Sequence, residues 1–170
     1  FLEKIDEGYD YVIGTRYSEG GSIPSDWGIH RKILSVYGNM FIRLLFGRKG
    51  IHDWTGGFRA LRKEVFLKER DELTEFKGYT FQVSFLHKAL RDGFKIGEVP
   101  FHFGERKLGS SKIAPAAYIF NLLKYVITAR LIEVITGPFG KVLVVGGIGF
   151  IINAVFFILA RRSAFIRCRV

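Results

Sequence analysis

The sequence predicts an α/β domain followed by an amphipathic helix and one transmembrane helix. Strand-like and helix-like segments alternate through the first 110 residues, where charges are frequent. Beyond residue 110 charges become rare, and one long run has none at all. Hydrophobic residues make up 48% of the 170 residues, which is too much apolar surface for a disordered chain. A folded core joined to membrane-associated helices is therefore expected.

Two short segments read as strands. Residues 9–15 form a β-branched and aromatic run closed by a glycine, and residues 95–103 form a second run that contains Pro100. Because proline cannot donate a backbone hydrogen bond, Pro100 indicates an edge strand. Two or three strands cannot build a parallel sheet covered on both faces, so the domain is expected to be incomplete.

Two helices are expected between these strands. The first has capping candidates at Ser25 and Asp26. Its apolar residues recur at helical spacing: Ile33, Leu34, Tyr37, Met40, Phe41, Leu44 and Leu45. The second has the same spacing at Phe81, Phe85, Leu86, Ala89 and Leu90. Asp92 and Gly93 are expected to end it.

Residues 113–135 predict a helix with a narrow polar stripe. Asn121, Lys124 and Thr128 share one face of an otherwise aliphatic and aromatic segment. Such a helix suits the surface of a membrane, and the alternative is an ordinary core helix. Gly137 and Pro138 are expected to end it before the next segment.

Residues 142–160 predict a transmembrane helix. The run carries no formal charge, and at ~1.5 Å per residue its length is roughly 28 Å, close to the thickness of the hydrocarbon core. The alternative, a buried helix of a soluble protein, would need a larger domain around it than this chain supplies.

Charge and cysteine content narrow the functional classes. A net charge of +10 on an apolar chain favours anionic membranes or anionic ligands, with nucleic acid as the competing partner. No nucleic-acid recognition module is present, so nucleic acid is not expected to bind. The single cysteine, Cys168, excludes a disulfide framework and cysteine-based zinc sites. The four histidines lack ligand spacing, so no metal site is expected from them.

Several polar residues are candidates for binding a phosphate. Arg31, Ser35 and Asn39 are four residues apart, so one helix face presents a guanidinium, a hydroxyl and an amide. A solvated helix face is the alternative. Arg16 directly follows the first strand, at the end where α/β sheets place ligands.

Two further segments stand out. In residues 53–59 a glycine pair lies between Asp53 and Arg59, which fits either a close approach to a ligand or a structural turn with an ion pair. Residues 103–112 combine glycines, serines and three cations, as in a loop that closes over phosphates. A basic patch attracted to anionic lipid would use the same residues.

Six motifs occur in order along residues 9–112. They are GTRYSEGG from Gly14, W-x-x-x-R-x-x-x-S-x-x-x-N from Trp27, DWTGGFRA from Asp53, GYTFQ from Gly78, EVPFHF from Glu98 and ER-x-x-G-x-SK from Glu105. In this order and spacing they resemble the family 2 glycosyltransferases, specifically the dolichol-phosphate (polyprenyl-phosphate) mannose synthases. The helices that follow resemble the membrane-anchored members, whose tail is a GtrA-like bundle.

The resemblance implies a GT-A, Rossmann-like fold that transfers mannose from GDP-mannose to a polyprenyl phosphate with inversion. It also implies a divalent metal, Mg or Mn, and a catalytic part on the cytoplasmic side of a membrane. By resemblance the acceptor phosphate would be held by Arg16, Arg31 and Ser35. The loop of residues 103–112 would contribute Arg106, Ser111 and Lys112 to the phosphates. The pocket near the sugar would contain the catalytic candidates Asp53 and Gln82.

The chain departs from the family in ways that limit this expectation. Residues 1–110 match only the C-terminal part of the catalytic domain, residues 111–136 the interfacial helix, and residues 137–170 a truncated GtrA-like domain with a basic tail. The Asp-x-Asp motif that carries the metal is absent, so the chain is expected to lack the metal ligands and to be inactive alone. A polyprenyl-phosphate glucosyltransferase and a noncatalytic module that binds anionic lipid remain the alternatives.

Overall fold

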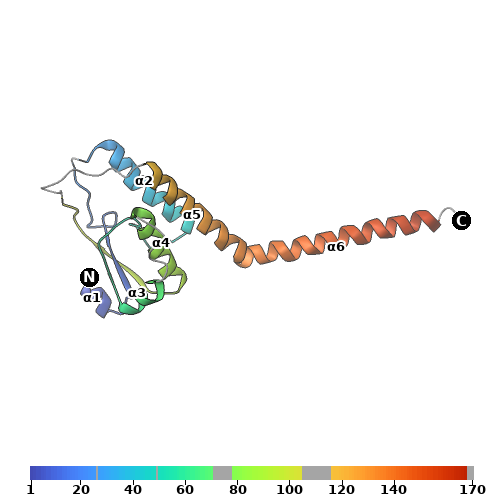
Figure 1. Cartoon of the computed structure of the whole chain (residues 1–170), viewed down its shortest axis with the longest axis horizontal. Helices are drawn as coiled ribbons and strands as arrows, with labels where there is room; N and C mark the ends of the chain where they lie inside the picture. Colours follow the sequence, from blue (N-terminus) through green and yellow to red (C-terminus); the bar gives the residue numbers. More distant parts are fainter. Residues whose placement is uncertain (26, 49, 71–77, 105–115, 168–170) are drawn as a thin grey trace. The chain divides into compact units, whose positions relative to one another are not determined.

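The computed structural model describes residues 1–25, 27–48, 50–70, 78–104 and 116–167 (Figure 1). Within it the chain divides into two compact units, Phe1–Ile127 and Thr128–Val170. The first unit contains the sheet and the helices that surround it, and the second contains the long apolar helix.

A small mixed sheet forms the centre of the first unit. Its strand order is β2-β1-β3: β1 (Tyr11–Thr15) pairs in parallel with β3 (Ile96–Pro100) and antiparallel with β2 (Arg59–Leu61). All five residues of β1 are buried, as the run of β-branched and aromatic residues predicts. The α/β class is therefore confirmed. In the described sheet β3 is an edge strand, as Pro100 predicts, but it ends at Pro100 and not at residue 103.

Three short elements are not anticipated from the sequence. They are α1 (Leu2–Asp6), α3 (Lys63–Glu69) and β2 itself. Each is too short for a periodic pattern to be recognised, and β2 has only three residues.

Helix α2 (Ile29–Phe46) carries three of the candidate residues, Arg31, Ser35 and Asn39. It begins after Gly28 without a side-chain cap, so the expected cap at Ser25 is wrong, and Asp26 lies outside the described residues. It ends at Gly47, whose φ of +64° is the left-handed conformation that terminates helices.

The face of α2 that is buried is not the one that its apolar stripe predicts. The periodic apolar residues predict a core-facing stripe, yet Ile33 is 49% exposed and Leu44 is 70% exposed. The opposite face turns inward through Asn39, Ile42 and Phe46. The sequence shows that a helix has two unlike faces but does not show which one meets the protein. Here the polar side meets the site, and the apolar side is left uncovered by the described residues.

Helix α4 (Gly78–Arg91) supplies much of the core. Val83, Leu86 and Ala89 are fully buried, and the Phe85 ring packs edge-on against Tyr11 of β1. The helix ends before Asp92 and Gly93, as predicted, with backbone hydrogen bonds from Gly93 and the next residue back to the last turn.

Helix α5 (Ala116–Thr136) belongs to the first unit as far as Ile127, and this part of it contacts α4. The hydroxyl of Tyr125 lies 3.1 Å from Nδ1 of His87, and Val126 is fully buried. The polar stripe of Asn121, Lys124 and Thr128 is exposed, but so are several apolar residues of the same helix. The prediction that α5 lies at a membrane surface stays a prediction.

Helix α6 (Pro138–Arg167) belongs to the second unit and is separated from α5 at Gly137, as the sequence predicts. Its segment Pro138–Ile158 is long and apolar enough to cross a membrane, and it is the one such helix among residues 1–167 that the structure describes (Figure 1). Apolar side chains are exposed on all its faces, which suits contact with lipid chains.

Candidate functional site

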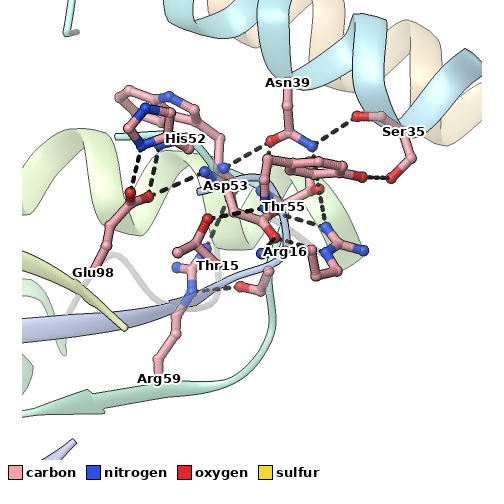
Figure 2. Close-up of polar contacts among 12 residues, drawn as sticks. Thr15, Arg16, Ser35, Asn39, His52, Asp53, Thr55, Arg59 and Glu98 are labelled. Carbon is pink, nitrogen blue, oxygen red and sulfur yellow. Dashed lines mark hydrogen bonds and ion pairs between the residues drawn. The ribbon is translucent and has the colours of Figure 1, made fainter. Parts of the chain in front are cut away.

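The candidate site begins where β1 ends. The Arg16 guanidinium pairs with Asp53 through Nε–Oδ2 and Nη2–Oδ1 distances of 2.6 and 2.8 Å, and the backbone N–H of Arg16 also donates to Oδ2 (Figure 2). Asp53 is fully buried, and the Arg16 side chain is 10% exposed. The pair therefore lies in a region of low dielectric, where its geometry is strongly fixed.

Arg59 does not form the ion pair with Asp53 that one interpretation of residues 53–59 suggested. Its guanidinium instead donates to the carbonyl oxygens of Trp54 and Gly56, to the carbonyl of Gln82 and to the Tyr11 hydroxyl. The close approach that a glycine permits is to the protein itself. A Cβ at Gly56 would lie 2.9 Å from the carbonyl oxygen of Gly14 on β1.

Glu98 on β3 holds the start of the same turn. One carboxylate oxygen accepts hydrogen bonds from the backbone N–H groups of His52 and Asp53, at 2.6 and 3.2 Å. The other lies 2.7 Å from Nδ1 of His52 (Figure 2). The motif EVPFHF begins at Glu98, but nothing in the sequence indicates this contact, because alternate positions of an edge strand ordinarily face solvent.

Asn39 holds the turn from the side of α2. It is 3% exposed, so the expectation that its amide joins Arg31 and Ser35 in facing a phosphate is wrong. Its Oδ1 accepts from the backbone N–H groups of Trp54 and Thr55, and its Nδ2 donates to the Thr55 hydroxyl at 3.0 Å. Arg16 donates to that hydroxyl as well, so Asn39 and Arg16 share one partner.

Tyr17 connects the candidates for phosphate binding. Its hydroxyl lies 2.5 Å from Oγ of Ser35, and the Arg16 guanidinium lies 5.1 Å from the centre of its ring. Burial raises the pKa of Tyr17 above its ordinary value, while the positive charges of Arg16 and Arg31 and the hydrogen bond with Ser35 oppose that rise. Arg31 stacks 3.7 Å from the centre of the Trp27 ring. Ser35 and Arg16 thus both contact the Tyr17 side chain, while Arg31 acts on it only through its charge.

The remaining candidate residues are divided between described and undescribed parts. Gln82 on α4 lies against the same turn, because a Cβ on Gly57 would come 3.0 Å from its Nε2. Asp53 and Gln82 therefore adjoin consecutive glycines. Arg106, Ser111 and Lys112 lie outside the described residues.

The described residues do not fit a divalent metal site. No group of three or more histidine, cysteine or acidic side chains gathers in that part of the chain. The two carboxylates of the site are engaged, Asp53 by Arg16 and Glu98 by His52 and the backbone.

Taken together, the described fold and site define an α/β protein with a helix able to cross a membrane and a cationic site beside β1. Arginine guanidinium and serine hydroxyl groups suit an anionic oxygen ligand such as a phosphate. Tyr17 is the member that the sequence analysis missed. Its position directly after Arg16 was the available signal, because neighbouring residues at the end of a strand can share one site.

Comparison with known proteins supports this class. No protein-family model matches the chain. Polyprenol monophosphomannose synthase of Mycolicibacterium smegmatis is 39% identical over 133 residues, which is 76% of this chain and 49% of that protein. Undecaprenyl-phosphate mannosyltransferase of Micrococcus luteus is 35% identical over 124 residues, or 71% of this chain and 50% of the relative.

These matches confirm the resemblance found in the sequence. The chain is homologous to the polyprenyl-phosphate mannose synthases, which are glycosyltransferases, and it spans about half the length of the two relatives (49% and 50%).

Proposed function

We propose that this chain is the acceptor-binding part of an enzyme that transfers mannose from GDP-mannose to a polyprenyl phosphate. The relatives are named for mannose transfer to such lipids. The observation that supports the acceptor role is the contact of both Ser35 and Arg16 with the Tyr17 side chain, with Arg31 one helical turn before Ser35 on α2. A lipid phosphate would find a hydroxyl and positive charge on the same side of α2.

The chemistry of this transfer suits a site without a strong base. An oxygen of the lipid phosphate attacks C1 of mannose, the bond from C1 to the GDP oxygen breaks, and GDP leaves with the electron pair. The attacking oxygen is already anionic, so no proton has to be removed from it. Attack on the side opposite GDP inverts the configuration at C1. The protein must offset the repulsion between two phosphate-bearing substrates, for which arginine side chains are suited.

The two arginines are not expected to contribute equally to phosphate binding. Arg16 directs Nε and Nη2 to Asp53 and Thr55, so its charge is largely offset inside the protein. Arg31, which no described carboxylate pairs with, is the stronger phosphate ligand, together with Ser35. Asp53 and Gln82 would border the sugar through the turn at Gly56 and Gly57. Arg106, Ser111 and Lys112 would reach the phosphates between the substrates.

The rest of the family's activity would depend on sequence outside this chain. The GT-A fold, the donor nucleotide and a Mg or Mn ion belong to this proposal, and so does the inactivity of the chain on its own. The donor would be read mainly by the portion of the relatives that the chain does not span. A glucosyl donor would then leave the acceptor site described here unchanged.

Helices α2 and α6 support a location at a membrane. Helix α6 is able to cross a bilayer. The exposed apolar face of α2 includes Ile33 and Leu44, and the helix contains cations but no acidic residue. A helix with this composition suits the boundary between anionic head groups and acyl chains. The site on its other face would then lie where a lipid phosphate is presented, on the cytoplasmic side.

Binding of farnesyl phosphate, a short polyprenyl phosphate, tests the acceptor site directly. The full 170-residue chain in detergent is titrated with farnesyl phosphate, and farnesol is used as the comparison without phosphate. We expect Arg31→Ala and Ser35→Ala each to weaken binding by about tenfold, because each removes a charge-assisted or hydroxyl contact worth about 1–2 kcal/mol.

Lys32→Ala is the matched control, since it removes a neighbouring cation of α2 that donates to the Ser25 carbonyl. Equal losses for Arg31→Ala and Lys32→Ala, with the same losses on vesicles of anionic phospholipid, would indicate general attraction to lipid head groups. That result would favour the noncatalytic membrane module over a dedicated acceptor site.

A further inference from the structure

We infer that Asn39 is a positioning residue that holds the two halves of the acceptor site in register. This inference rests on the proposed function. Ser35 and Arg31 come from α2, whereas Arg16 and Tyr17 follow β1. Asn39 links α2 to the turn that anchors Arg16, and neither the sequence motif nor the relatives' names assign it this role.

The hydrogen bonds of Asn39 are the first support. Oδ1 accepts from the backbone N–H of Trp54 at 2.7 Å and from that of Thr55 at 3.3 Å. Nδ2 donates to the Ser35 carbonyl oxygen at 2.8 Å and to the Thr55 hydroxyl at 3.0 Å (Figure 2). All the donors and acceptors of the amide are therefore engaged, and an amide with its full set of partners has one well-defined orientation.

The second support is that the hydrogen-bond partners of Asn39 belong to both halves of the site. Ser35 is one helical turn before Asn39, and its carbonyl is one of the two acceptors of Nδ2. Thr55 receives hydrogen bonds from both Asn39 and Arg16, and Arg16 is in turn paired with Asp53. Asn39 thus connects the backbone of Ser35 with the Thr55 hydroxyl that Arg16 also contacts. It is 3% exposed, so it acts on the ligand only through these neighbours.

The site has a second link between the same halves, the contact of Tyr17 with Ser35. That link involves side chains that face the proposed phosphate, so a ligand would compete for it. The Asn39 link is buried behind the site and can persist while the ligand is bound. A rigid link behind the ligand is what fixes the separation of groups that must reach the same phosphate.

Titration of the full chain in detergent with farnesyl phosphate separates positioning from folding. We expect Asn39→Ala to raise the dissociation constant by about tenfold while the number of binding sites per folded chain is unchanged. In a Ser35→Ala background the same change should cost less, about threefold, because one of the groups it positions is gone. Ser84→Ala is the control, since it removes a comparably buried hydrogen bond on α4.

Two other variants decide the question if Asn39→Ala fails to fold. Thr55→Val removes the hydroxyl that Asn39 and Arg16 share, and Thr55→Ser retains it. The inference requires weaker binding for the valine variant and near-normal binding for the serine variant. An unchanged dissociation constant in Asn39→Ala, or fewer sites with the same constant, would mean that Asn39 only stabilises the fold. If the unmodified chain does not prefer farnesyl phosphate over farnesol, the proposed function fails as well, and the two failures are thereby distinguished.

Discussion

Asp53 is the carboxylate that anchors Arg16 in the site. Its carboxylate is fully buried and receives three hydrogen bonds from the side chain and backbone of Arg16. Its own backbone N–H is held by Glu98. A buried carboxylate is tolerated because the guanidinium compensates its charge, and each partner would be costly to leave alone.

Asp53→Asn should therefore destabilise the first unit strongly. The substitution leaves the Arg16 charge nearly buried without a counterion, which costs about 3–5 kcal/mol in comparable buried pairs. Urea unfolding followed by tryptophan fluorescence measures the loss, because Trp54 is fully buried in the same turn.

Asp92→Asn provides the comparison for this experiment. Asp92 meets Lys68 and Arg91 only at 3.9 and 3.8 Å, and it is partly exposed. Its removal should change stability by less than about 0.5 kcal/mol. Similar small losses at both positions would show that the Arg16–Asp53 pair does not stabilise the fold.

The sequence could locate the residues of this site more easily than their partners. Arg16, Ser35 and Asp53 were identified, because charged or hydroxyl groups next to strand ends and helix faces are typical of ligand sites. The pairing of Asp53 with Arg16 across 37 positions could not be derived, since it depends on how the turn folds over β1. Asn39 was misplaced for a related reason: spacing shows which residues share a face, not how deep that face lies.

At the scale of elements, α2 is the most informative helix. Its periodic apolar residues form a stripe that sequence reasoning assigns to a core, and among the described residues that stripe is uncovered. The composition of an apolar stripe is the same whether it contacts protein or lipid. Only the inward position of Asn39, Ile42 and Phe46 decides between the two faces.

Spin labels can determine what the uncovered stripe of α2 contacts. With Cys168→Ser as background, a nitroxide at Leu44→Cys in lipid nanodiscs should collide more often with oxygen, which partitions into lipid, than with a water-soluble nickel chelate. A label at Lys68→Cys on α3, whose side chain is 63% exposed, should show the reverse order. Identical behaviour at the two sites would contradict the placement of α2 in lipid.

At the scale of the whole molecule, the sequence predicts the long elements well and the small ones poorly. The buried strand β1, the ends of α4 and α5 and the apolar helix α6 follow from composition, periodicity and glycine positions. Strand β2 could not be predicted from the sequence, because three residues are too few to show an alternating pattern and the strand forms only by pairing with β1.

The stability of the first unit should decline in alkaline solution through the buried phenol of Tyr11 and the half-buried phenol of Tyr17. Burial raises the pKa of Tyr11 and of Tyr17 above the ordinary value of 10.0. Above that pH the unfolded chain loses these protons while the folded chain keeps them, so alkali favours unfolding. The stabilising contribution is complete below pH 10.0 and is lost as pH rises through the folded-state pKa values.

Urea titrations at a series of pH values measure this effect. The free energy of unfolding should fall by up to about 1.4 kcal/mol per pH unit for each such phenol. Tyr11→Phe and Tyr17→Phe should each make the decline shallower. Tyr37→Phe, at an exposed position of α2, serves as the control. If the free energy of unfolding fell equally steeply with pH in Tyr11→Phe, Tyr17→Phe and the unmodified chain, these two phenols would not be the cause of the decline.

The two unlike faces of α2 have a consequence for which carriers the protein could accept. If one rigid helix both rests in lipid and presents Ser35 and Arg31, the head group is met at a set height above the hydrocarbon, whatever the tail below it. The position of the phosphate in the membrane, and not the length of the lipid tail, would then decide whether a carrier reaches the site. Carriers with few or many isoprene units would then be served alike, and discrimination between lipids would depend on the charged end alone.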